Sequence, residues 1–440
     1  MNDPLPDTVN PHYLQQVVAT ARTHEVVASE DIVTSGAIKL LAKGARIDDE
    51  ARDRLLQHKL RRPLEECTEV IGGVVSAQFE SIGDALLAKY PLLRALCTTE
   101  RARSAPASVA GVALTLPMQS LMTVYGQSRP GRLEHAVGVA MLALSLARRL
   151  LPGAVDRHRV LAIAGLLHDV GELYIDPVHL QSGVRLDGAG WRHIAIHPLV
   201  GHRVLLDMAG AGPQVAEAVL QHHERMDGFG YPHGVGGEAF TVDGEIVAAA
   251  EWLMALVENE TSPLARASMA LRLVPGEFRP ELIKVIAGVA KEVPALATEH
   301  NVAPPLAEAL PRILRLAGSL DRFNASRGWI EERMAESAPA LRNVLGVGLN
   351  RLRRIQVSFA STGLDASNAQ ALLGELSAGQ DPEVYVEITS LIKELEWRMR
   401  ELERSQRLRA SLLTGAEQSV VEEVIARLNG SSIPAAEALA

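Results

Sequence analysis

The sequence is organised around residues 135–251, a stretch that contains the segment HHERMDGFGYP at 222–232. Within this stretch, residues able to bind a metal ion recur at spacings of 25 to 33 residues. Such a spacing is about the length of one helix and its return, so each group is expected to lie on a different helix and to point toward one place. The series consists of His135, His168, Asp169, His197, His222, His223 and Glu251.

The donor types indicate a site for transition-metal ions. Imidazole nitrogens and carboxylate oxygens together suit Fe, Mn or Zn, and a carboxylate such as that of Asp169 can bridge two ions. The first interpretation is therefore a dinuclear metal hydrolase. The alternative for His168 and Asp169 is a buried histidine that is hydrogen-bonded to an aspartate, which leaves the rest of the series without an explanation.

The same stretch resembles a known family. Residues 168–171, HDVG, are similar to the HD motif of metal-dependent phosphohydrolases. Residues 222–232 match the HHExxDGxGYP signature of the HD-GYP subfamily at its eight fixed positions, and residues 197–201 resemble its HPxxG step. The resemblance covers about residues 120 to 270 and implies an HD-type helical bundle.

The resemblance also implies a function. Typical members hydrolyse cyclic di-GMP to pGpG or GMP, with a bridging aspartate and a metal-held hydroxide that attacks phosphorus in line. It implies that His168 and Asp169 are catalytic, that the seven residues of the series bind two divalent ions, expected to be Fe or Mn, and that Gly230, Tyr231 and Pro232 form a loop that shapes the site. Another phosphorylated nucleotide is an alternative substrate. The alternative function is a regulatory HD-GYP module with little or no catalysis that acts through a signalling-protein partner.

Three positions at or near the expected ligands depart from the family pattern. Gly131 stands four residues before His135, where members with a third metal place a glutamate, so two metals are expected rather than three. Glu172 replaces the lysine of HDxGK and reverses the charge where a phosphodiester would approach. It is either an extra ligand or a solvated residue at a helix end. Glu251 replaces the aspartate of the VAD motif and reaches one methylene further.

The segment that follows Glu251 also departs from the family. Glu260 and Pro263 stand where the family has basic residues that hold the cyclic dinucleotide, and Arg266 is the nearest cation. The remaining histidines of the region are interpreted as surface or packing residues; they are His158, His179, His193 and His202.

Composition places the rest of the chain in a mainly α class. Of its 440 residues, 47% are hydrophobic and only 4% are aromatic, with abundant alanine and leucine, which favours helices. We expect a small N-terminal α+β module, acting as a packing cap or as a sensor, and a C-terminal helical extension. The predicted parts are a β/α module at 1–65, connector helices at 66–120, the metal-dependent phosphohydrolase domain at 121–320, a helical region at 321–380, a long amphipathic helix at 381–415, and a C-terminal helix and tail at 416–440.

Charge and targeting signals limit the partners. A net charge of −9 argues against a nucleic-acid polymer, which needs an excess of lysine and arginine. Two isolated cysteines, no signal peptide and no membrane-spanning apolar run predict a cytoplasmic protein. The apolar stripe of 381–415 predicts either a short coiled coil, and hence a homodimer, or an amphipathic helix on the body of the protein.

Overall fold

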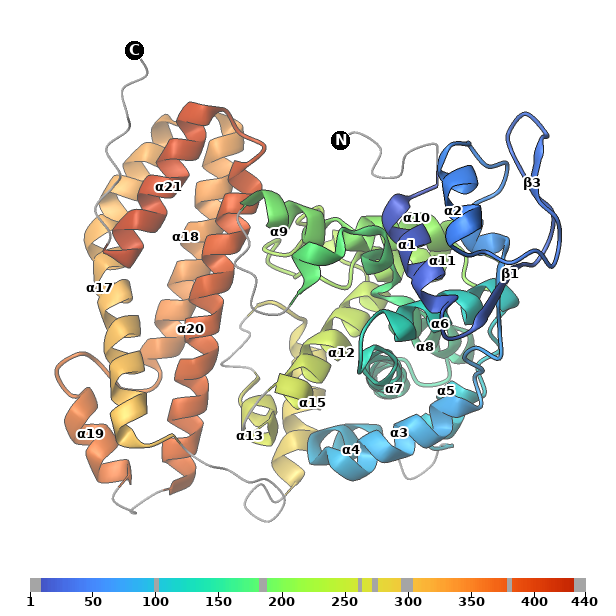
Figure 1. Cartoon of the computed structure of the whole chain (residues 1–440). Helices are drawn as coiled ribbons and strands as arrows, with labels where there is room; N and C mark the ends of the chain where they lie inside the picture. Colours follow the sequence, from blue (N-terminus) through green and yellow to red (C-terminus); the bar gives the residue numbers. More distant parts are fainter. Residues whose placement is uncertain are drawn as a thin grey trace. The chain divides into compact units, whose positions relative to one another are not determined.

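The computed structural model describes residues 9–98, 103–181, 188–259, 263–270, 276–293, 304–377 and 382–430. These residues are mainly helical, as predicted, with only short strands (Figure 1). The chain divides into two compact units, Met1–Arg185 with His193–Asn259, and Leu186–Arg192 with Glu260–Ala440. The six-part division of the sequence stays a prediction. Within the described ranges, no helix has both the length and the apolar character needed to cross a membrane.

The first unit begins with a small α+β module. Its helices are α1 (Pro11–Thr20) and α2 (Asp49–Leu56), and the side chains of Asn10 and Asp48 accept hydrogen bonds from the first backbone N–H groups of these helices. Its strands form two antiparallel pairs, and a 3-10 turn, η1 (Leu64–Glu66), precedes the last strand. The pairs are β1 (Glu25–Ala28) with β4 (Thr68–Ile71) and β2 (Ile32–Val33) with β3 (Lys39–Leu41).

Four connecting helices lead from this module to the residues that form the site. They are α3 (Gln78–Lys89), α4 (Pro91–Cys97), α5 (Ala105–Ala110) and α6 (Leu116–Ser128). Proline occupies the first turn of α4, α5 and α6, where its missing N–H costs no helical hydrogen bond.

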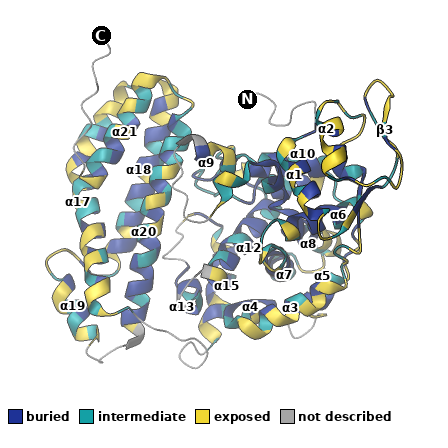
Figure 2. Ribbon diagram, viewed as in Figure 1, coloured by how far each residue is buried: buried dark blue, intermediate teal, exposed yellow. Residues whose placement is uncertain are grey.

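The central helices of the first unit are α7 (Arg132–Leu150), α8 (Val155–Leu167), α10 (His197–Leu206), α11 (Pro213–Leu220) and α12 (Val242–Asn259). Every residue of α7 from Ala136 to Ala147 is buried (Figure 2). A helix that is apolar on all sides must be enclosed by others, and α7 packs against α3, α8 and α12. Because these helices enclose one another, polar residues at their ends are carried into the interior.

Shorter elements join these helices. They are the 3-10 turns η2 (Val170–Tyr174), η3 (Pro177–Leu180) and η4 (Gly237–Ala239), and the helix α9 (Gly188–Ala195), whose residues up to Arg192 belong to the second unit. Of these, η2 packs against α1, α6 and α10, so the residues directly after His168 and Asp169 lie within the same packed region.

The second unit contains α13 (Pro263–Ser268), α15 (Pro280–Glu292), α17 (Leu306–Glu336), α18 (Pro339–Ala360), α19 (Ala369–Glu375), α20 (Pro382–Ala410) and α21 (Gly415–Asn429). The long helices α17, α18, α20 and α21 pack on one another. The apolar stripe of α20, including Leu391 and Leu395, is buried inside this unit. Of the two predicted alternatives, α20 is therefore an amphipathic helix packed on its own chain. This packing does not test the homodimer, which stays a prediction. Residues 431–440 of the predicted tail lie outside the described residues.

Candidate metal centre

The HD pair stands at the end of a buried helix. Residues Leu161–Leu167 of α8 are buried, His168 caps the end of this helix, and Asp169 directly precedes the turn η2. His168 is fully buried and Asp169 is 7% exposed. The helix thus stops at Leu167, directly before the two residues of the HD pair.

Close backbone contacts fix this turn against α10. A Cβ added to Gly171 would lie 2.1 Å from the carbonyl oxygen of His197 and 2.8 Å from the amide nitrogen of Gly201. Only glycine allows that approach. The glycines of the HDVG and HPLVG segments therefore bring the start of α10, with His197, beside Asp169.

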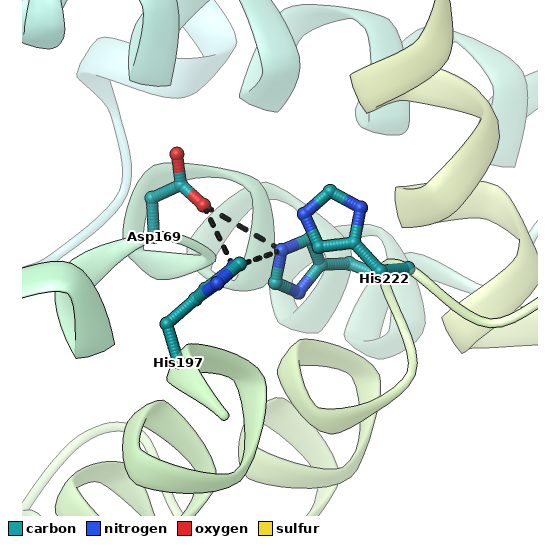
Figure 3. A group of neighbouring side chains, drawn as sticks. Asp169, His197 and His222 are labelled. Carbon is teal, nitrogen blue, oxygen red and sulfur yellow. Dashed lines mark hydrogen bonds and ion pairs between the residues drawn. The ribbon is translucent and has the colours of Figure 1, made fainter. Parts of the chain in front are cut away.

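One group of potential ligands surrounds the first oxygen of Asp169 (Figure 3). Asp169 Oδ1 lies 3.2 Å from His197 Nε2 and 3.5 Å from His222 Nε2, and these two nitrogens are 3.0 Å apart. With His223, the four residues place one ligand atom each within 4.8 Å of one another. Nitrogens that each bind an ion at about 2.0–2.1 Å are separated by about 3.0–3.4 Å, so these spacings fit ligands of one ion.

A second group lies beside the first. His135 Nε2 is 3.3 Å from His168 Nε2 and 3.0 Å from Glu251 Oε2, and Glu251 Oε2 is 3.3 Å from His168 Nε2. The longer side chain of Glu251 therefore still reaches the two histidines from α12. These three residues form the second set with metal-ligand spacing among the described residues.

Asp169 connects the two groups. Its Oδ2 lies 3.4 Å from His168 Nε2, while its Oδ1 faces His197 and His222. A carboxylate that offers one oxygen to each of two ligand groups has the geometry of a bridge between two ions. The donor set, imidazole nitrogens with carboxylates, suits Fe, Mn or Zn. The structure thus brings together all seven residues of the predicted series.

The histidines are held with Nε2 toward the centre. The Nδ1 atoms of His168, His197 and His222 donate to the carbonyl oxygens of Gly165, Ile194 and Val219, at 2.8, 2.8 and 2.6 Å. Because a carbonyl oxygen can only accept, Nδ1 carries a proton, and Nε2 is the nitrogen that can offer a lone pair to an ion. For His135, the Nδ1 partner is the carboxylate of Glu258, at 2.9 Å. Such outer partners orient metal-binding imidazoles.

The buried charges act differently on the five histidines. The carboxylates of Asp169 and Glu251 outweigh burial and raise the pKa of His168 to about 10, and neighbouring carboxylates also raise the pKa values of His135 and His197. Burial lowers the pKa of His222 to about 4 and holds the pKa of His223 well below its ordinary value. Burial alone would raise the pKa of Asp169 and of Glu251, but neighbouring histidines hold both pKa values well below the ordinary range. The carboxylates are therefore ionised while His222 and His223 are neutral.

The residues after His223 form a clamped loop. Glu224 is 1% exposed, and its Oε1 accepts hydrogen bonds from the amides of His233 and Gly234, at 2.8 and 3.0 Å. A Cβ on Gly230 would lie 2.3 Å from the Cα of Glu224, so the loop folds back tightly. Tyr231 stacks on His223, with ring centroids 4.6 Å apart. The clamping role of Glu224 was not predicted from the sequence.

Sequence reasoning also missed the groups that contact Asp169 from α6 and α7. Tyr125 Oη lies 3.3 Å from Asp169 Oδ2, and Arg132 Nη1 lies 3.2 Å from the same oxygen. Arg132 also forms an ion pair with Glu172. Arg132 precedes His135 by three residues, a helical spacing that could have identified it, and Glu258 follows Glu251 by seven, two turns along α12.

The structure accounts for two of the departures from the family pattern, Glu172 and Gly131. The side chain of Glu172 is 14% exposed and paired with Arg132, so its interpretation as a solvated residue at a helix end is wrong. Gly131 caps α7 with φ of +83°, a left-handed conformation that disfavours a glutamate. Pro263 is the first residue of α13 in the second unit, and Glu260 lies outside the described residues.

The remaining histidines lie outside both groups among the described residues. The rings of His179 and His193 stack on each other, with centroids 4.8 Å apart, and His158 Nε2 is 2.8 Å from the carbonyl oxygen of Leu151.

Comparisons with known proteins agree with this centre. Residues 118–274 match the model of the family described as HD domain. The cyclic di-GMP phosphodiesterase PA4108 of Pseudomonas aeruginosa is 38% identical over 110 residues, which are 24% of this chain and 26% of that protein. The 3'3'-cGAMP-specific phosphodiesterase 3 of Vibrio cholerae is 26% identical over 209 residues, which are 46% of this chain and 45% of that protein. The chain thus spans less than half the length of either relative.

A solved structure, Bd1817, described as a HDG"Y"P protein from Bdellovibrio bacteriovorus, aligns over 61% of this chain and 94% of that chain, with 16% identity and a TM-score of 0.32. Residues 118–274 therefore match the HD domain family, and residues 222–232 carry the HHExxDGxGYP segment typical of its HD-GYP branch.

Proposed function

We propose that this chain is a metal-dependent phosphodiesterase that hydrolyses a cyclic dinucleotide. The observation that carries the proposal is the position of Asp169, with Oδ1 3.2 Å from His197 Nε2 in one ligand group and Oδ2 3.4 Å from His168 Nε2 in the other. Two divalent ions, when bound, stabilise the attacking and leaving oxygens of an in-line displacement at phosphorus. We propose that the two ions are Fe or Mn.

The chain's own residues orient this centre. Backbone carbonyls fix the rings of His168, His197 and His222, and the Asp169 carboxylate holds the two ligand groups together. The loop clamped by Glu224 places Tyr231 against His223 and so covers that imidazole from one side.

The names of the relatives support a cyclic dinucleotide as the substrate class. One relative is named for cyclic di-GMP and another for 3'3'-cGAMP. We propose cyclic di-GMP as the first substrate to test and 3'3'-cGAMP as the second. The charge of Glu172, taken alone, would repel a phosphodiester and favour a regulatory module. Because Glu172 is paired with Arg132, this argument against an enzyme is weakened.

The test is turnover by protein purified without oxygen and reconstituted with Fe or Mn. Cyclic di-GMP and 3'3'-cGAMP are supplied separately, and the linear dinucleotide and mononucleotides are resolved by chromatography. The control is the double variant His168→Ala/Asp169→Ala, which removes one ligand and the bridge. We expect product from the wild type, and both bound metal and product to fall to background in the variant.

Wild-type protein that carries two metals and yields no product from either dinucleotide would contradict the proposed function and favour the regulatory alternative. Full metal content in the double variant would contradict the assignment of the site.

A further inference from the structure

We infer that Arg132 binds a non-bridging phosphate oxygen of the substrate, in an orientation fixed by Glu172. This inference rests on the proposed function, because it assigns a residue that holds the phosphodiester at the same centre. It is carried by four observations, namely the position of Arg132 on α7, its contacts, its remaining donors and the local charge.

The start of α7 brings Arg132 to the centre. Arg132 is the first residue of the helix, and His135 lies one turn further on, within the second ligand group. Residues three apart on a helix share a face, so Arg132 and His135 point toward the same region. Gly131, with φ of +83°, makes the sharp entry into the helix at this point.

The guanidinium contacts the bridging carboxylate directly. Arg132 Nη1 lies 3.2 Å from Asp169 Oδ2 and 3.1 Å from Tyr125 Oη, and Nη2 pairs with Glu172. Its Cζ lies 5.4 Å from the centre of the Tyr125 ring. Asp169 Oδ2 is also the oxygen that faces His168. The guanidinium is thus adjacent to the place where a phosphodiester would lie if it bound to metal ions held by both ligand groups.

Arg132 keeps hydrogen-bond donors beyond these contacts. A guanidinium has five N–H donors, and the contacts with Tyr125, Asp169 and Glu172 account for three of them. The side chain is 17% exposed, so it is held within the protein yet open to a ligand. Planar guanidinium groups bind phosphate oxygens well, and an orientation fixed beforehand reduces the entropy lost on binding.

The negative charge around the centre favours a cation at this position. Four carboxylates surround the two ligand groups, those of Asp169, Glu172, Glu251 and Glu258. Two divalent ions would offset these four charges, and Arg132 supplies one further positive charge. That charge complements the single negative charge of a phosphodiester. Glu172 therefore acts as the anchor of Arg132 rather than as a barrier to substrate.

The test compares Arg132→Gln, Arg132→Lys and Glu172→Gln with the wild type. Metal content is measured by mass spectrometry, binding of inorganic phosphate by calorimetry, and KM and kcat with the substrate that the wild type turns over. We expect Arg132→Gln to weaken phosphate binding and to raise KM about 10- to 100-fold, the usual range for a hydrogen bond to a charged group, with metal content unchanged. Arg132→Lys should recover part of the phosphate affinity, and Glu172→Gln should weaken it less than Arg132→Gln.

The matched control is Arg129→Gln. Arg129 lies three residues before Arg132, in the loop that precedes α7, and its Nη1 donates to the carbonyl oxygen of Leu180. The variant removes the same charge from the same segment, so a small effect there separates direct contact from general electrostatic attraction. Thermal unfolding of each variant checks that it is folded.

Three results would overturn the inference. They are phosphate binding by Arg132→Gln equal to that of the wild type, loss of metal from Arg132→Gln, and no phosphate binding by metal-loaded wild type. Wild-type protein that binds phosphate but hydrolyses neither dinucleotide would contradict the proposed function alone, and the loss of phosphate binding in Arg132→Gln would still support the role of Arg132.

Discussion

Four histidines of the centre each have one ring nitrogen that faces the site and another that is held by a neighbour; they are His135, His168, His197 and His222. His222 illustrates this arrangement, since its Nδ1 is bound to the carbonyl oxygen of Val219 while burial keeps the ring neutral by lowering its pKa to about 4. His135 differs, because its Nδ1 partner is the carboxylate of Glu258 from α12. A carboxylate partner orients the ring and also increases the basicity of the opposite nitrogen.

Replacing Glu258 should therefore weaken one metal site selectively. In Glu258→Ala, we expect the affinity of the group containing His135 to fall about 10- to 100-fold, with the group around His197 unchanged. Competition with a chelator, followed by metal analysis, measures both sites. The matched control is Glu134→Ala, which removes an exposed carboxylate from the residue next to His135. Equal losses in the two variants would show that overall charge, and not the contact with His135, sets the affinity.

Residue types and spacing predicted the seven candidate ligands, because imidazoles and carboxylates recur at intervals of about one helix and its return. The same reasoning could not predict the pair of Arg132 and Glu172. The two residues are 40 positions apart, and neither position has a spacing that implies the other. Their contact depends on the end of α8 at Leu167 and on the turn that follows it. The sequence alone therefore showed a reversed charge at position 172 without the cation that accompanies it.

At the scale of elements, the centre depends on how closely η2 packs against α10. Gly171 lies at this contact, where an added Cβ would be 2.1 Å from the carbonyl oxygen of His197. Asp169 and His197 supply ligands from the two sides of that contact. The separation of two backbones thus sets the separation of two metal ligands.

A methyl group at position 171 should push these elements apart. In Gly171→Ala, we expect a loss of about 1–3 kcal/mol in the free energy of unfolding, as for other overpacked sites, together with reduced metal content. Denaturant titration and metal analysis measure the two effects. The matched control is Gly328→Ala. Gly328 lies in α17, where an added Cβ has nothing within 4 Å, so this variant should be more stable by about 0.5–1 kcal/mol. Full metal content in Gly171→Ala would show that the turn can shift without separating the ligands.

The helix α20 shows why the sequence left two alternatives for the C-terminal region. A repeating apolar stripe has nearly the same pattern in a coiled coil and in a helix packed on its own chain. The choice depends on α17, α18 and α21, which cover the stripe from distant parts of the sequence. Buried ion pairs of this unit, such as that of Arg266 with Glu394, join residues 128 positions apart and leave no local signal.

At the scale of the whole molecule, all seven predicted ligands belong to the first unit, so metal removal should act on that unit alone. A ligand that binds only the folded state stabilises it by about 2.7 kcal/mol at a free concentration of 100 times its dissociation constant. After chelation, we expect faster hydrogen exchange in α7, α8 and α12 and unchanged exchange in α17, α18 and α20. Mass spectrometry of peptides from the two units measures this difference within one sample. The variant His168→Ala/Asp169→Ala should not respond to the chelator. Equal acceleration in both units would contradict the expectation, because it would mean that the two units unfold as one cooperative body.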